Sequence, residues 1–157
     1  MLKRTPLFEA HQQLGARLVE FGGWEMPVYY TSIVEEHLAV RRAAGIFDIS
    51  HMGQITVSGA QATAFLNQVL TNDLCKLAPG WGQYTLLCNE QGGVIDDLYA
   101  YRLAEEVYLL IINAARTAVD VAWLQAQAAQ FGAGNALHLT NAAHTYAAVA
   151  VQGKPEM

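Results

Sequence analysis

The sequence predicts an α+β domain with a largely antiparallel sheet and packed helices. Two apolar stretches, 83–88 and 94–102, flank a short connection that ends in Gly92-Gly93, a pattern typical of a β-hairpin. Helical periodicity runs through 114–130, between further short strands. From residue 54 onward the predicted order is β-α-β-β-β-α-β-β, which favours antiparallel pairing with the helices on one face of the sheet.

The chain before residue 30 contains one helix signal and then a stretch without a regular pattern. Thr5-Pro6 predicts a helix start, and Gly15 can end that helix. In 16–30, two glycines and a proline stand among large apolar residues. We expect this stretch to break regular secondary structure.

A capping box marks the next helix. Ser32 is followed three residues later by Glu35, so a helix is predicted over 33–44, ending at Gly45. The remaining elements follow from apolar periodicity. They are strands at 54–57, 107–112, 136–139 and 145–151, a helix at 61–70, and a helix at 114–130 with Val119, Ala122, Trp123 and Ala126 on one side and Gly132 at its end.

Composition narrows the class of protein. The chain has 157 residues, of which 53% are hydrophobic and 15% charged, enough for a sizeable core. It has no apolar run that could span a membrane and no secretory signal pattern at its start. Two cysteines in no CxxC spacing favour a reducing interior, the cytoplasm if the source is bacterial. With a net charge of -5 and no basic patch, nucleic acid is not expected as a partner.

Asp96-Asp97 is the first candidate for chemistry, because aspartate is depleted in strands. Neighbouring strand residues point to opposite faces, so the two carboxylates cannot serve one site together. The carboxylate on the core face must be paired, protonated or used. One alternative is that one aspartate caps the hairpin turn while the other is solvated. The other is a carboxylate that faces a pocket and accepts a proton or stabilises positive charge on a substrate nitrogen.

The run from Asp48 to Met52 places Asp, Ser and His close together in the sequence. A hydrolytic triad is not indicated, because triad members meet in space and Ser50 lacks a Gly-x-Ser-x-Gly turn. None of the five histidines has metal-site spacing, so no metal is expected. His51 is interpreted as structural, and Met52 as core or as a soft wall for a flat ring. No glycine pattern predicts nucleotide phosphate binding.

Taken together, these segments resemble the glycine cleavage T-protein family over essentially the whole chain. The matching residues are Thr5-Pro6-Leu7, Gly15-Ala16-Arg17, Phe21-x-Gly23-Trp24-x-Met26-Pro27, Glu36-His37-x-Ala39-Val40-Arg41, Phe47-Asp48-Ile49-Ser50-His51-Met52, Thr71-Asn72-Asp73, Tyr84, Asn89-x-x-Gly92-Gly93-x-Ile95-Asp96-Asp97-Leu98, Asn113-Ala114-Ala115 and Val151-Gln152-Gly153.

The resemblance implies a folate-dependent aminomethyltransferase. In such an enzyme, a one-carbon unit passes from aminomethyl-dihydrolipoate on the lipoylated H-protein to tetrahydrofolate, and ammonia is released. The family's essential aspartate corresponds to Asp97. Its folate pocket corresponds to Met52, Tyr84, Asp97 and Asn113, and Tyr101 is added because it shares a strand face with Asp97.

Family chains are more than twice as long, so the resemblance implies that residues 1–157 form a single incomplete folate-binding domain, inactive by itself. The apolar strand at Val149-Ala150-Val151 fits that expectation, because it reads as a core strand at the end of the chain. Two alternatives share the fold: a non-catalytic folate-binding protein of iron–sulfur cluster maturation, and the folate domain of a sarcosine or dimethylglycine oxidising enzyme.

Overall fold

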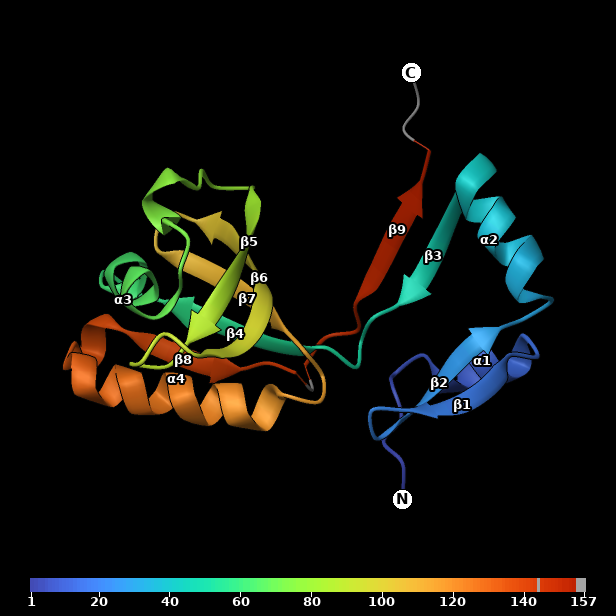
Figure 1. Ribbon diagram of the computed structural model, residues 1–157, viewed down its shortest axis with the longest axis horizontal. Coiled ribbons are helices and arrows are strands. Elements are labelled where there is room, and N and C mark those ends of the chain that lie inside the picture. Colours follow the sequence, from blue (N-terminus) through green and yellow to red (C-terminus); the bar gives the residue numbers. More distant parts are fainter. Residues whose placement is uncertain (144, 155–157) are drawn as a thin grey trace. The chain divides into compact units, whose positions relative to one another are not determined.

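The computed structural model describes residues 1–143 and 145–154, and these residues form two compact units (Figure 1). Unit 1 comprises residues 1–51 and 145–154 of the described chain, and unit 2 comprises residues 52–143. The α+β fold class predicted from the sequence is confirmed, and every pair of neighbouring strands in the three sheets is antiparallel.

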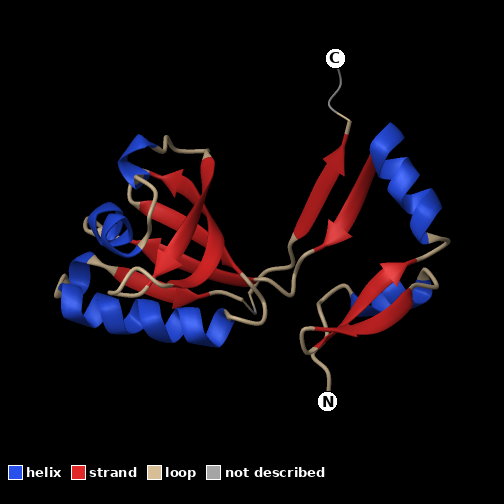
Figure 2. Cartoon of the chain, viewed as in Figure 1, coloured by secondary structure: helices blue, strands red, loops and turns tan. Residues whose placement is uncertain are grey.

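Unit 2 is built on a five-stranded sheet in the order β5-β6-β7-β4-β8. Its helices pack on one face of the sheet and share one apolar core with the strands. Figure 2 shows these helices in blue and the strands in red. The elements are β4 (Gly53–Ser58), α3 (Ala62–Val69), η1 (Leu74–Lys76), β5 (Gly82–Cys88), β6 (Val94–Ala104), β7 (Val107–Ile112), α4 (Thr117–Phe131), η2 (Gly134–Ala136) and β8 (His138–Asn141).

The core of unit 2 explains why the other face of the sheet is available for chemistry. Phe65 on α3 stacks edge-to-face on Phe131 of α4, with ring centroids 5.6 Å apart. Leu98 and Ala100 of β6 are buried beneath them, whereas Tyr99 and Tyr101 on the same strand point away from the core and are about two fifths exposed. Alternation along β6 therefore gives one apolar face and one open face.

Local signals position the hairpin and the long helix. Asn89 holds the turn between β5 and β6, because its side-chain oxygen accepts hydrogen bonds from the backbone N–H of Gln91 and of Gly93, at 3.0 and 2.8 Å. At the end of α4, Gly132 adopts φ +72°, the left-handed conformation in which glycine carries no steric cost. The predicted hairpin and the predicted end of α4 are both confirmed.

Unit 1 consists of two small antiparallel sheets and two helices. The first sheet pairs β1 with β2, and the second pairs β3 with β9, whose residues are about a hundred positions apart in the sequence. The elements are α1 (Phe8–Gln13), β1 (Arg17–Phe21), β2 (Trp24–Tyr29), α2 (Ile33–Arg42), β3 (Ala44–Asp48) and β9 (Val149–Gly153).

The prediction that 16–30 breaks regular structure is wrong, because this stretch forms the β1–β2 hairpin. Gly22 and Gly23 make its two-residue turn, with φ of +57° and +86°. Two positive φ values in succession match the right-handed twist of a hairpin, so glycines that suggested a break are what joins the strands. Pro27 is tolerated because a two-stranded sheet consists of edge strands only.

The predicted helix over 33–44 begins as expected but ends early. The Ser32 side chain accepts a hydrogen bond from the Glu35 N–H, so the cap is confirmed. However, α2 ends at Arg42 and the chain turns directly into β3, so Gly45 lies within a strand. The first helix, expected to start at Thr5-Pro6, begins instead at Phe8 as α1.

The two strands predicted at the end of the chain belong to different sheets. The predicted strand at 136–139 appears as β8, which pairs with β4 in unit 2. The predicted strand at 145–151 appears as β9, which pairs with β3 in unit 1. Val149 and Val151 are 47% and 70% exposed, so the expectation of a core strand is wrong for this chain by itself.

A candidate folate-binding face on unit 2

Asp97 lies on the open face of the unit 2 sheet, near the start of β6. Its neighbours along the same face are Tyr99 and Tyr101, and Tyr84 comes from the adjacent strand β5. Tyr84 is 53% exposed. The predicted alternation of Asp96 and Asp97 between the two faces is confirmed, since Asp96 is buried and Asp97 is exposed.

Two neutral donors hold the Asp97 carboxylate, one on each oxygen. The Tyr84 hydroxyl donates to Oδ2 at 2.9 Å, and the Asn113 side-chain amide donates to Oδ1 at 3.2 Å. A carboxylate has about four acceptor sites, so each oxygen keeps one free. The hydrogen bond to Asp97, with smaller effects of burial and of the carboxylate charges, raises the pKa of Tyr84, which keeps it a donor. The carboxylate is oriented and still open to a third partner.

A glycine makes room for the aromatic part of this face. The rings of Tyr99 and Tyr101 lie 4.9 Å apart between centroids and are tilted by 35°. Gly82 pairs with Tyr101 across the strands, and a Cβ atom at Gly82 would lie 2.6 Å from an atom of each ring. Any side chain at position 82 would therefore displace the two tyrosines.

The structure brings four of the five predicted site residues onto one face of unit 2, three of them joined by hydrogen bonds. Tyr84 and Asn113 both bond to Asp97, and Tyr101 lies four residues along the same strand face. Met52 is half-buried and immediately precedes β4, whose first residue pairs with Ile112, the neighbour of Asn113. Met52 is thus placed beside Asn113 in the sheet register.

Asp96 neither caps the turn nor reaches solvent, so the first alternative for the aspartate pair is wrong. Its Oδ1 accepts a hydrogen bond from the Asn113 side-chain amide at 2.9 Å, and its Oδ2 accepts one from the Asn113 backbone N–H at 3.2 Å. Asn89 fills the turn-capping role. The same asparagine therefore contacts both carboxylates, one on each side of the sheet.

Asp120, on the inward face of α4, was missed from the sequence. It is fully buried, and neither of its carboxyl oxygens has a hydrogen-bonding partner among the described residues. Val119, Ala122, Trp123 and Ala126 lie on one side of this helix, as predicted, where they line a surface hollow. The buried residues of the helix are Asp120, Leu124 and Gln127. These three residues stand at i, i+4 and i+7, the spacing of one helix face, and this spacing was the signal available in the sequence.

Unit 1 contains a second buried carboxylate, Asp48, and its histidine partner is His11 rather than His51. His11 Nε2 lies 2.9 Å from Asp48 Oδ2, and His11 Nδ1 lies 2.7 Å from the Tyr30 hydroxyl. The Thr5 hydroxyl and the Ser50 backbone N–H complete the shell of Asp48 at 2.6 and 2.9 Å. Ser50 donates its own hydroxyl to the backbone oxygen of Ala148, so it is not poised as a nucleophile.

His51 packs against aromatic rings in the same unit. Its ring meets those of Phe21 and Trp24 edge-on, with centroids 5.9 and 6.5 Å apart. Burial lowers the pKa of His51, and the Asp48 charge opposes that effect only in part. The ring is therefore held neutral, in keeping with the interpretation of His51 as a structural residue.

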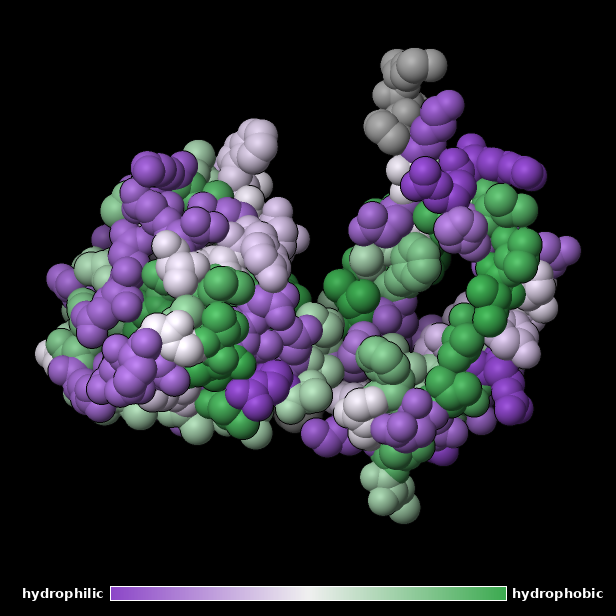
Figure 3. Space-filling model, in the orientation of Figure 1, coloured by the Kyte–Doolittle hydropathy of each residue, from purple (hydrophilic) through white to green (hydrophobic). Residues whose placement is uncertain are grey.

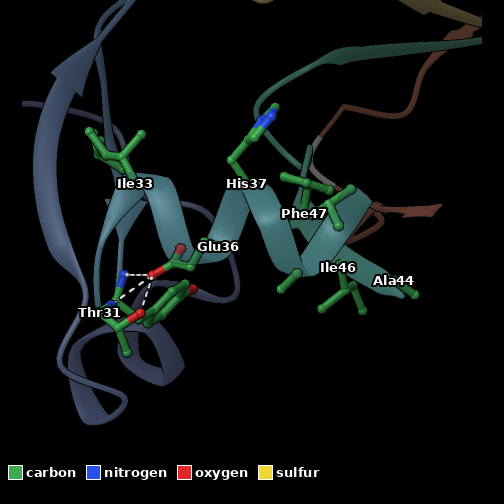
Figure 4. A pocket seen from close by; sticks show the side chains of 12 residues that line it. Thr31, Ile33, Glu36, His37, Ala44, Ile46 and Phe47 are labelled. Atoms are coloured by element: carbon green, nitrogen blue, oxygen red, sulfur yellow. Dashed lines mark hydrogen bonds between the residues drawn. The ribbon is translucent and has the colours of Figure 1, made fainter. Parts of the chain in front are cut away.

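The surface of unit 1 also carries an apolar hollow of about 530 Å³ between α2 and β3. None of the ten residues of α2 is buried, and a hydrophobic band follows this helix in Figure 3. Figure 4 shows Glu36 at one end of the hollow, where its carboxylate accepts hydrogen bonds from the backbone N–H groups of Tyr30 and Thr31. These bonds to Glu36 fix the entry of α2.

Neither a metal cluster nor a membrane span is found in the described part of the chain. Among residues 1–143 and 145–154, no three His, Cys, Asp or Glu side chains are grouped to hold a metal ion. Within the same residues, no helix is long and apolar enough to cross a bilayer. Cys75 and Cys88 are both free, and His144 lies outside the described residues.

Comparison with known proteins decides the family. The family described as GCVT N-terminal domain matches residues 7–156, nearly the whole chain. The chain belongs to this family. Membership of the GCVT N-terminal domain family confirms the resemblance drawn from the motifs.

Individual relatives and a solved structure support the same family. The chain is 54% identical over 152 residues to the aminomethyltransferase of Thermus thermophilus, covering 97% of this chain and 42% of that protein. It is 58% identical over 124 residues to that of Geobacillus kaustophilus, covering 79% and 34%. The crystal structure of the glycine cleavage system aminomethyltransferase T from Bartonella henselae matches with a TM-score of 0.84 at 38% identity, covering 98% of this chain and 41% of that one. The chain thus matches between about a third and two fifths of the length of these proteins.

Proposed function

We propose that this chain is the folate-contacting part of a tetrahydrofolate-dependent aminomethyltransferase of the glycine cleavage system. The one-carbon unit arrives as aminomethyl-dihydrolipoate on the lipoylated H-protein and leaves as 5,10-methylenetetrahydrofolate, while ammonia and the dihydrolipoyl thiol are released. The observation that carries the proposal is the exposed Asp97 carboxylate, held by Tyr84 and Asn113 on a face rich in tyrosine. The names of the relatives favour this function over the two alternatives.

Asp97 is the proposed catalytic residue. As a folate amine bonds to the transferred carbon it loses a proton, and a carboxylate with a free acceptor site on each oxygen can take that proton. The same negative charge stabilises the iminium-like cation that forms when ammonia or the thiol departs. Because Tyr84 and Asn113 fix both oxygens, the carboxylate does not have to reorient during these steps.

The remaining predicted residues would bind the pterin. Tyr84 and Tyr101 offer partly exposed rings on the same face as Asp97, and offset stacking on a flat heterocycle suits such rings. Met52, half-buried beside β4, would provide a soft apolar wall. We further propose that the described units belong to one incomplete folate-binding domain, spanning 1–157, of a longer cytoplasmic enzyme. Residues 144 and 155–157 of that span lie outside the described structure.

A chimeric enzyme tests the activity. This chain replaces the matching two fifths of the Thermus thermophilus aminomethyltransferase, and methylenetetrahydrofolate formation is assayed with lipoylated H-protein. We expect an active chimera, and a loss of about 10² to 10⁴ in kcat for Asp97→Asn, the usual range for a general acid or base. Glu106→Gln, an exposed carboxylate beyond the far end of β6, is the matched control and retains activity. A folded chimera without activity would refute the proposal.

Direct binding to this chain sharpens the test. In a ¹⁵N-labelled sample titrated with tetrahydrofolate, we expect shifts of the resonances of Tyr84, Asp97, Tyr101 and Asn113, because these residues share one face. The Glu106→Gln variant should give the same pattern, and Asp97→Asn should weaken it. Shifts confined to unit 1 would place the folate elsewhere.

A further inference from the structure

Tyr99 stands between two of the predicted folate-binding residues on the open face of β6. Asp97, Tyr99 and Tyr101 are exposed, and the residues between them in the strand are buried. Residues on the same face of a strand are about 6.5 Å apart for each two positions, so Tyr99 lies half as far from Asp97 as Tyr101 does. A flat ligand that extends from Asp97 to Tyr101 must therefore lie over Tyr99.

The register of the sheet places Tyr99 in the middle of this face. Tyr84 on β5 is its partner on one side, and Ile111 on β7 is its partner on the other. Tyr84 is also the residue that donates a hydrogen bond to Asp97. Tyr99 is 39% exposed, so part of its side chain is open to a ligand.

Gly82 gives the rings of Tyr99 and Tyr101 their position. The ring centroids lie 4.9 Å apart, and a Cβ atom at residue 82 would lie 2.6 Å from Cε1 of Tyr99 and 2.6 Å from Cδ1 of Tyr101. The φ angle of Gly82 is not positive, so its backbone conformation does not require glycine. Glycine weakens the interior of a strand and often marks a close approach. Here the two rings are what approach the β5 backbone closely.

We propose that Tyr99 is a further folate-binding residue, and that Gly82 positions its ring together with that of Tyr101 against a flat group of the folate. The inference rests on the proposed function. Tetrahydrofolate carries a pterin and a benzoyl group, and the two nitrogens that receive the carbon lie where these groups are joined. With those nitrogens at Asp97, one of the two groups extends along β6 over Tyr99. Partly exposed aromatic rings suit offset stacking on such a group.

Tetrahydrofolate binding to the whole chain, measured by NMR titration, tests the inference. We expect Tyr99→Ala to raise the Kd by about 5- to 100-fold, the effect of removing an aromatic side chain that stacks on a nucleobase. Gly82→Ala should also raise the Kd, and it should weaken the nuclear Overhauser effects between the Tyr99 ring and the backbone of residue 82. Tyr146→Ala, at an exposed tyrosine of unit 1, is the matched control and should leave the Kd unchanged.

A folded Tyr99→Ala variant with an unchanged Kd would overturn the binding role, and an unchanged Kd in Gly82→Ala would overturn the positioning role. A purely structural role for Tyr99 would lower the stability to urea and leave the Kd as it is. If Tyr99→Ala does not fold, Tyr99→Leu decides, because leucine keeps an apolar side chain and removes the ring. Folate-induced shifts at Asp97 and Tyr84 with an unchanged Kd in the variants would refute this inference alone. Absence of any binding would refute the proposed function as well.

Discussion

Each unit of this molecule buries a carboxyl group, and the two groups differ in the number of hydrogen bonds that they accept. Asp48 in unit 1 has a side chain only 1% exposed, and it accepts hydrogen bonds from Thr5, His11 and Ser50. Asp120 in unit 2 has a side chain that is fully buried, and neither of its carboxyl oxygens has a hydrogen-bonding partner among the described residues. The depth of burial is alike, so the number of donors distinguishes the two sites.

The pKa values follow the donors. Burial alone would raise the pKa of Asp48, but hydrogen bonds from His11, Ser50 and Thr5 outweigh it and lower the pKa. At Asp120 nothing outweighs burial, and the neighbouring Asp96 adds to it. A buried carboxyl group that accepts several hydrogen bonds stays ionised. One that lacks donors and lies near another acid holds its proton to a higher pH.

Removing the anion in unit 1 should have the largest effect on stability. Asp48→Ala leaves His11 and Thr5 without their buried partner, and we expect a loss of about 3 to 5 kcal/mol in the free energy of unfolding. Urea unfolding followed by NMR resonances of each unit measures it. Glu9→Gln, an exposed acid on α1, is the control and should change the value by less than about 1 kcal/mol. Equal losses in both variants would show that the donors around Asp48 do not matter.

The pH dependence of stability should have opposite signs in the two units. The folded pKa of Asp120, about 7, lies above its ordinary value of 3.8, so between these values the unfolded chain binds fewer protons. Unit 2 should therefore lose about 2 to 4 kcal/mol as the pH rises from 4 to 7. In unit 1 the pKa values of Asp48 and His51 are both lowered, so its stability should rise with pH.

The same urea experiment, repeated at several pH values, checks these slopes. Asp120→Asn should flatten the curve of unit 2 and leave that of unit 1 unchanged. Slopes of the same sign in both units of the unmodified chain would contradict the contrast between Asp48, whose pKa is lowered, and Asp120, whose pKa is raised.

The smallest effect tests the outer part of the shell around Asp48. Tyr30→Phe removes the hydroxyl that meets His11 Nδ1 and keeps the His11–Asp48 pair. We expect a loss of about 1 kcal/mol, typical of one hydrogen bond, confined to unit 1. Tyr146→Phe, at another exposed tyrosine of unit 1, is the matched control. A loss as large as that of Asp48→Ala would mean that Tyr30 and Asp48 act as one network.

Much of unit 2 was predictable from the sequence, because its signals are local. The alternation around Asp96-Asp97 and the glycines of the hairpin are read within a few residues. The β3 strand was missed because its partner, β9, lies about a hundred residues away. Asp120 was missed because helix periodicity is judged from apolar residues, and nothing near it in the sequence indicates that this acid is buried.

The two faces of β6 also limit how this segment can change over evolution. A single-residue insertion or deletion within the strand would exchange the positions of its inward and outward side chains, placing Asp97 in the core and Asp96 outside. The turn held by Asn89 can change length without that exchange, because strand pairing resumes beyond it. Descendants of this gene should therefore accumulate gaps in the turn, while the spacing from the aspartates to Leu98 and Tyr101 stays constant.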